Sequence, residues 1–206
     1  MKTFFVCCLL LLSFSLKGQK NLYRTIIAND ISFVQVNAAN FFKVEFHTVE
    51  GNEITIEAEM EGEYSQDLDI EVNTNGNTLL IAAGFAPSFE NPNDKLSAHK
   101  VVSILLKLTI PNFKKVEVYG TNSRVVLEGK YKELDVSLSD GECELHNIVG
   151  NANVKTQSGS ISVFAKSVQI NANSKYGKVS FNPIPEGLFI YKLQTMTGNI
   201  ELSKTE

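Results

Sequence analysis

Two pairs of carboxylates in the C-terminal half of the chain have the types and spacing that could do acid–base chemistry. Glu117 and Asp135 are 18 residues apart, and Asp140 and Glu142 are separated by one residue. If Glu117 and Asp135 lie on neighbouring strands, their Cβ atoms are about 5 Å apart. Glycosidases place two carboxyl groups about 5 to 10 Å apart. These residues therefore suggest one possible class, a carbohydrate-active lyase or hydrolase.

The positions that continue the same spacing do not extend an acidic surface. Beyond Asp135 the equivalent residues are Asn153, Asn171 and Lys192. The positions equivalent to Glu142 are Arg124, Ser160, Lys178 and Asn199. A mixed row of this kind is typical of a solvated face. We therefore expect no catalytic residue and no enzyme, and keep the carbohydrate-active enzyme as the alternative function.

Other chemistry-bearing residue types are scattered. His47, His99 and His146 lie in three separate regions without the spacing of metal ligands. Cys143 alternates with Glu142 and Glu144, so we expect it to be a buried apolar thiol and not a nucleophile. The sequence contains no glycine-rich phosphate loop, and we expect no metal and no cofactor. The net charge of −4 argues against a nucleic-acid partner.

A regular grid of turns underlies these positions. Alternating apolar residues precede and follow a short polar turn five times, at intervals of 18, 18, 18 and 21 residues, and the turn positions are Ser123, Gly141, Gly159, Gly177 and Gly198. Strands with one apolar face must stack to bury it. The pattern predicts about five 18-residue rungs over residues 115–203. We expect positive φ at the glycines and expect Ser123 to suit the turn less well.

The segments before the grid also alternate with period two. Residues 42–46 and 54–58 flank a turn and predict a hairpin, as do residues 68–72 and 79–81 around Asn75-Gly76. Residues 84–98 predict the longest loop. The expected fold class is thus all-β, a right-handed parallel β-helix or solenoid preceded by antiparallel hairpins.

The first residues are typical of an export signal. Lys2 precedes an apolar run at 4–12 that is too short to cross a bilayer, which takes about 20 residues. We expect a signal peptide at 1–18 and a single β-solenoid domain at 19–206. The protein would then be periplasmic or extracellular, and not embedded in a membrane after cleavage.

Several short motifs add a resemblance. The apolar strand at 103–111 ends in proline, and the turns Ser-Asp-Gly (139–141), Gln-Ser-Gly-Ser-Ile (157–161) and Thr-Gly-Asn-Ile (197–200) follow it in series. Over about residues 30–203 the chain resembles the auto-transporter adhesin head (GIN-type) domains of unknown function, which are found in bacterial exported proteins. The resemblance implies a β-solenoid capped by antiparallel strands.

Signal, charge and resemblance together predict an exported, non-enzymatic binding or adhesion module of the bacterial envelope. Its partner would be a surface glycan or an envelope protein, and the variable outer face or the loop at 84–98 would bind it. A structural or sensory envelope protein that packs on a partner is a third option.

Overall fold

The computed structural model describes residues 19–62, 64–87, 89 and 102–205. The expected signal peptide, His99 and most of the expected loop at 84–98 lie outside these residues. Within these residues, fifteen strands form one sheet, joined by loops and a short 3-10 turn, η2 (Ser65–Asp67). The strands are β1 (Lys20–Ile27), β2 (Phe33–Asn37), β3 (Lys43–Val49), β4 (Glu53–Gly62), β5 (Leu68–Asn75), β6 (Thr78–Phe85), β7 (Val102–Pro111), β8 (Lys114–Gly120), β9 (Arg124–Leu138), β10 (Cys143–Thr156), β11 (Ile161–Ala165), β12 (Gln169–Ser174), β13 (Val179–Phe181), β14 (Ile190–Thr195) and β15 (Ile200–Lys204).

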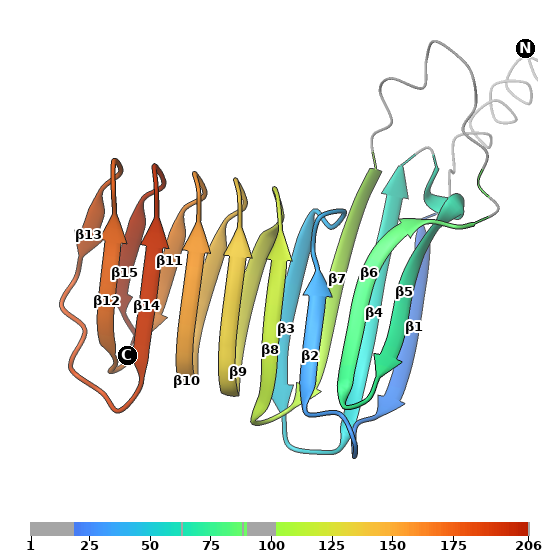
Figure 1. Cartoon of the computed structure of the whole chain (residues 1–206), viewed down its shortest axis with the longest axis horizontal. Helices are drawn as coiled ribbons and strands as arrows, with labels where there is room; N and C mark the ends of the chain where they lie inside the picture. Colours follow the sequence, from blue (N-terminus) through green and yellow to red (C-terminus); the bar gives the residue numbers. More distant parts are fainter. Residues whose placement is uncertain (1–18, 63, 88, 90–101, 206) are drawn as a thin grey trace, which may run out of the picture.

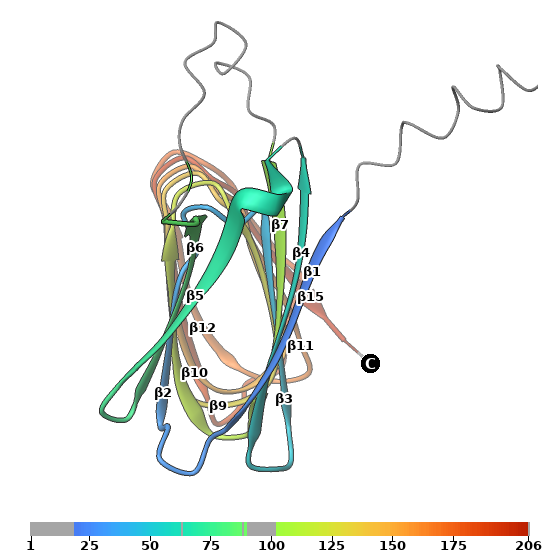
Figure 2. The same cartoon turned by 90° about the vertical axis from the view of Figure 1, so that its right-hand side faces the viewer.

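The sheet folds over on itself into two facing walls (Figures 1 and 2). The first wall has the order β1-β4-β7-β3-β9-β10-β11-β15-β13, and the second has the order β5-β6-β2-β8-β9-β10-β14-β12. The long strands β9 and β10 belong to both walls. They bend from one wall to the other near Gly129 (φ 116°) and Gly150 (φ 141°), where the missing side chain permits a left-handed backbone. We call this bend the lower edge and the opposite turns the upper edge.

The strand pairing is mixed, and the predicted right-handed parallel β-helix is therefore wrong. Parallel pairs such as β9–β10 and β10–β11 share the sheet with the antiparallel pairs β1–β4, β4–β7 and β5–β6. The all-β class is confirmed, but the chain forms one mixed sheet that nearly closes on itself. Period-two alternation marks which side chains face inward. It carries no information about strand direction, which is why the prediction failed.

One of the two predicted hairpins is present. Strands β5 and β6 pair antiparallel around Gly76 (φ 59°), with Asn75 opposite Thr78. Strands β3 and β4 follow each other closely in sequence, but β7 lies between them, parallel to β3 and antiparallel to β4. The hairpin predicted for residues 42–58 is therefore wrong, because a strand from much later in the chain pairs with both of its arms.

The last strands do not stack in sequence order. Strand β14 pairs with β10 on one side and with β12 on the other, and β15 lies in the same way between β11 and β13. Strands β12 and β13 come first in the sequence. The chain then returns through residues 182–189, and β14 and β15 lie between these strands and the rest of the sheet (Figure 1). The rung that ends the stack is β12–β13, and the C-terminal rung is internal.

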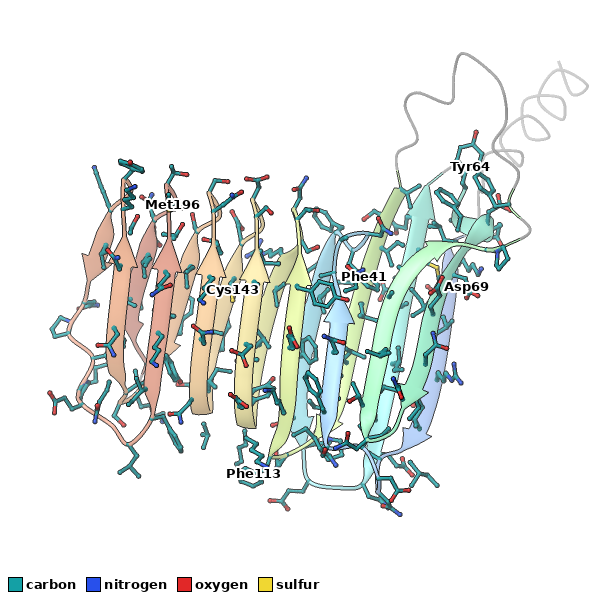
Figure 3. The ribbon with its side chains drawn as sticks, viewed as in Figure 1. Phe41, Tyr64, Asp69, Phe113, Cys143 and Met196 are labelled. Atoms are coloured by element: carbon teal, nitrogen blue, oxygen red, sulfur yellow. The ribbon has the colours of Figure 1, made fainter. Side chains whose placement is uncertain are left out.

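The space between the walls is filled by the inward-facing apolar residues. Cys143 is fully buried among them (Figure 3), as predicted, and burial raises the pKa of its thiol. Two tyrosines, Tyr131 and Tyr191, are buried as well, and their hydroxyls donate to the carbonyl oxygens of Glu128 (3.0 Å) and Ile148 (2.5 Å). Among the described residues, no helix is long and apolar enough to cross a membrane.

Candidate ligand-binding face

The five repeated turn positions form one column along the upper edge. A Cβ built on Gly141 would lie 2.2 Å from the Ser123 carbonyl oxygen, and one on Gly159 would lie 1.7 Å from that of Gly141. The column continues with Gly198, whose Cβ would meet the Gly159 oxygen at 2.1 Å, and then with Gly177 against Gly198, also at 2.1 Å. These contacts again place the C-terminal rung, which contains Gly198, between the rungs of Gly159 and Gly177.

The reason for glycine at these positions differs from the expected one. Positive φ among the described glycines occurs elsewhere, at Gly51, Gly62, Gly76, Gly129 and Gly150. The expectation of positive φ in the column is wrong, and the requirement is close approach between stacked backbones. Ser123 begins the column, and its buried hydroxyl shares its proton between the carbonyl oxygens of Ala38 and Phe41 (2.7 Å for Phe41).

The two carboxylate pairs lie in different places. Glu117 and Asp135 are register partners on β8 and β9, on the outer surface of the second wall. Asp140 and Glu142 lie in the turn at the upper edge, where the Ser158 hydroxyl donates to Asp140 at 2.5 Å. The structure therefore brings together the members of each pair but does not combine the pairs into one site.

Glu117 and Asp135 belong to a longer row that crosses the second wall. Register pairing aligns one outward side chain from each of six neighbouring strands. We call this set the polar row: Gln35, Glu117, Asp135, Asn153, Lys192 and Asn171. Gln35 donates to Glu117 (3.2 Å) and Asn153 donates to Asp135 (3.0 Å), so the two adjacent carboxylates are flanked by an amide on each side.

Residues beside the polar row also carry hydrogen-bonding side chains. A hollow of about 260 Å³ lies over β9, β10 and β14, where Asp135, Asn153 and Lys192 share its lining with Glu133 and Asn151. Lys115 forms an ion pair with Glu133 (2.9 Å), and this hydrogen bond raises the pKa of the lysine. This face thus presents both donors and acceptors, an arrangement that can bind a ligand rich in hydroxyl or amide groups.

The first wall unites residues that the sequence places far apart. His47 on β3 and His146 on β10 flank Glu128 on β9 in one register row, and the His47 Nδ1 to Glu128 Oε2 distance is 3.4 Å. His146 stacks on Phe164 with ring centroids 4.7 Å apart. Sequence reasoning treated these histidines as unrelated, because only the β3–β9 pairing brings them together. The described residues form no cluster that could hold a metal ion.

Exposed tyrosines can stack on sugar rings, and the repeat region offers two of them among the described residues. Tyr119 and Tyr176 are exposed, whereas Tyr131 and Tyr191 are buried. Tyr119 lies on β8, in the register row next to the polar row. Its ring can therefore add an apolar face to a ligand that lies on that row.

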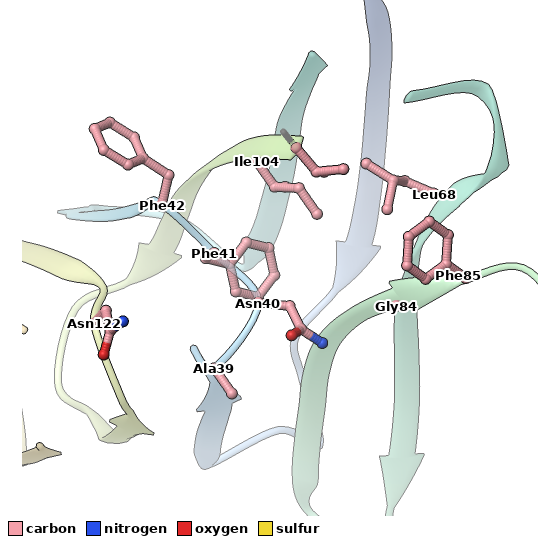
Figure 4. Close-up of a pocket in the computed structure, with 10 residues that line it drawn as sticks. Ala39, Asn40, Phe41, Phe42, Leu68, Gly84, Phe85, Ile104 and Asn122 are labelled. Atoms are coloured by element: carbon pink, nitrogen blue, oxygen red, sulfur yellow. The ribbon is translucent and has the colours of Figure 1, made fainter. Parts of the chain in front are cut away.

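An apolar hollow lies at the upper edge (Figure 4). Its volume is about 520 Å³, and Phe41, Leu68, Phe85 and Ile104 supply much of its lining. Asn40 at its side is already engaged, since its amide donates to the Ala83 carbonyl (2.7 Å). From Phe85 the chain runs towards residues outside the described range, and we assign no ligand to this hollow.

Comparison with known proteins supports the fold. No family model matches the chain, and no curated protein matches it. A solved structure of a "putative cell adhesion protein" from Clostridium sporogenes is similar, with a TM-score of 0.62, 15% identity, and coverage of 91% of this chain and 100% of that one. The chain thus shares the fold of that protein.

Two further solved structures are more distant. A "putative adhesin" from Parabacteroides merdae has a TM-score of 0.43 at 13% identity and covers 91% of this chain and 97% of its own. One from Bacteroides fragilis has a TM-score of 0.32 at 14% identity, with 89% and 97% covered. At these scores the likeness carries no argument about function.

Proposed function

We propose that the chain is an exported, non-enzymatic adhesion module of the auto-transporter adhesin head (GIN-type) kind, which binds a surface glycan through the polar row. The observation that carries this proposal is the row itself. Six hydrogen-bonding side chains on six adjacent strands are spaced at about the 4.8 Å separation of the strands. A polymer that repeats its hydroxyl groups can meet the same donors and acceptors along such a row.

The chemistry of the row favours binding over catalysis. Both of the central carboxylates already accept a hydrogen bond from a neighbouring amide, Glu117 from Gln35 and Asp135 from Asn153. The hollow on this face is lined by Asp135 but not by Glu117. A glycosidase needs both carboxyl groups at one bond of the substrate. The two carboxylates are therefore better placed to accept hydrogen bonds from a ligand than to flank a scissile bond.

Location is part of the proposal. The apolar run at 4–12 would direct export and be removed with residues 1–18. Every described strand lies within residues 19–206, so the remaining chain contains the whole described sheet. Exposed on the cell envelope or outside the cell, the polar row would meet glycans of the same or another cell.

A glycan array probed with residues 19–206 tests this function. We expect binding to a defined set of glycans and a loss of about tenfold or more in affinity for the double variant Asp135→Ala/Asn153→Ala, because a pair of ligand hydrogen bonds is removed. The matched control is Ser162→Ala/Glu201→Ala, a register pair on the outer surface of the first wall. The control should bind like the parent.

Two results would contradict the proposal. Equal losses in the two double variants would show that the polar row has no special part in binding. Cleavage of a bound glycan by the parent chain, abolished by Glu117→Gln/Asp135→Asn, would favour the carbohydrate-active enzyme instead.

A further inference from the structure

The lower edge exposes a row of apolar side chains where turn residues are usually polar. Val49, Phe113, Val149 and Leu188 are 41%, 60%, 37% and 93% exposed. They lie on successive parts of the edge, and Figure 3 shows Phe113 at its tip. We call these four residues the lower rim. Apolar residues scattered singly over a surface need no explanation, but an aligned group on one edge marks an interaction site.

Backbone contacts connect three members of the rim. The Asn112 amide, next to Phe113, donates to the Val49 carbonyl (2.9 Å), and the Phe113 amide donates to the Lys130 carbonyl (2.9 Å). Lys130 is in turn the register partner of Val149 on β10. These contacts join the Val49, Phe113 and Val149 parts of the rim, and the exposed Lys130 lies between Phe113 and Val149.

Backbone strain is concentrated on the same edge. Among the described residues, the non-glycine positions with positive φ are Phe113 (62°) and Asn147 (47°). A left-handed backbone costs about 1 kcal/mol or more for a bulky side chain such as Phe. Strain of this kind is found at functional sites more often than elsewhere. Here it holds the Phe113 side chain out into solvent, where it contributes little to the core.

A hollow next to the rim has a lining suited to an amphiphile. It has a volume of about 370 Å³, and Val149, Leu188, Phe189 and Ile148 provide its apolar surface. Lys166 is the charged residue in its lining, and the lining contains no carboxylate. The site can therefore take an apolar chain while the lysine meets a negative group.

We propose that the lower rim docks on an anionic lipid surface. Phe113, Val149 and Leu188 enter the boundary between head groups and acyl chains, and Lys130 and Lys166 lie at the level of the anionic head groups. Apolar side chains on separate turns along a narrow edge can each enter a fluid lipid layer. A folded protein partner would instead need a separate groove to match each side chain. The acidic residues Glu50 and Glu53 lie beyond Val49, and the exposed Glu186 lies two residues before Leu188. The contact is therefore centred on Phe113, Lys130 and Val149.

Co-sedimentation with lipid vesicles tests this inference. Residues 19–206 are used, because the apolar run at 4–12 would bind lipid by itself. We expect binding to phosphatidylglycerol vesicles and a drop of about tenfold or more in the partition coefficient for Phe113→Ser/Leu188→Ser, since two apolar side chains no longer leave water. The matched control is Tyr176→Ser/Met196→Ser on the upper edge, where both side chains are also exposed (70% and 45%).

A second variant separates charge from apolar insertion. Lys130→Glu/Lys166→Glu should weaken binding to phosphatidylglycerol vesicles several-fold and make it less sensitive to salt. Because Phe113, Leu188, Lys130 and Lys166 are all exposed, thermal unfolding of each variant should match the parent within a few degrees. Leu188→Asp, at the most exposed position, serves as the rim variant if Phe113→Ser/Leu188→Ser unfolds early.

The outcomes are decisive in both directions. The inference is overturned if the parent does not bind phosphatidylglycerol vesicles, if it binds phosphatidylcholine vesicles equally well, or if the upper-edge variant loses as much as the rim variant. Glycan binding lies on a different face. A rim variant that keeps glycan binding but loses vesicle binding supports this inference independently of the proposed function.

Discussion

Replacing Gly159 by alanine should destabilise the folded chain by about 3 kcal/mol, one of the largest effects expected for a single methyl group. The new Cβ would lie 1.7 Å from the Gly141 carbonyl oxygen and 2.6 Å from its carbonyl carbon. Both are backbone atoms of a stacked turn, so relief requires movement of a whole rung. The free energy of unfolding from urea titration measures the effect.

Two other glycines provide matched controls for this substitution. At Gly84, on β6, the nearest atom to a new Cβ is a Glu71 carboxylate oxygen at 3.7 Å, and Gly84→Ala should change stability by less than about 0.5 kcal/mol. Gly76 has open space but φ of 59°, so Gly76→Ala should cost about 1 kcal/mol through the backbone alone. If Gly159→Ala is tolerated as well as Gly84→Ala, the stacked glycine column is wrong.

Shortening Leu193 to alanine should cost about 2 to 5 kcal/mol, whereas the same change at Ile170 should cost only about 1 kcal/mol. Leu193 on β14 is fully buried between the strands on either side. Ile170 on β12 is only partly buried, because no further strand covers the end of the stack. The two substitutions remove groups of similar size. The difference between their losses of stability therefore shows which strand is internal and which is at the end of the stack.

A simple stack in sequence order would reverse this result. Strand β12 would then be internal and β14 terminal, and Ile170→Ala would be the more destabilising substitution. Urea unfolding of the two variants, compared at equal m-value, distinguishes the two orders. Circular dichroism at low denaturant provides the control that both variants begin from the same folded state.

Local features of the fold could be predicted because they depend on neighbouring residues. Alternation placed Cys143 in the core, and Asn75-Gly76 predicted the β5–β6 hairpin, since both signals are contained within a few residues. The recurring glycines were also found, although their reason was not. The distance from a Cβ to the carbonyl oxygen of the adjacent turn depends on how the rungs stack, and the sequence of one rung does not give that distance.

Long-range pairing could not be predicted, and the candidate site depends on it. The 18-residue spacing aligned Glu117, Asp135 and Asn153, but Gln35 joined the polar row only through the β2–β8 pairing. Lys192 precedes Asn171 in the row because the chain returns after residues 182–189. Loop-closing pairs of this kind are chosen by the burial of whole strands, and all of the candidate strands have the same alternation.

The order of the last rungs is the central claim, because it decides which side chains are neighbours in the polar row and places Lys192 beside Asn153. Disulfide trapping tests it directly on the outward positions Lys155, Gln194 and Asn173, which follow one another across β10, β14 and β12. Adjacent strands are about 4.8 Å apart, whereas Cα atoms more than about 7 Å apart cannot be bridged. We predict that Lys155→Cys/Gln194→Cys oxidises readily to an intramolecular disulfide and that Lys155→Cys/Asn173→Cys does not. The buried Cys143 should not compete. Efficient bridging of residues 155 and 173, with none between 155 and 194, would contradict the account.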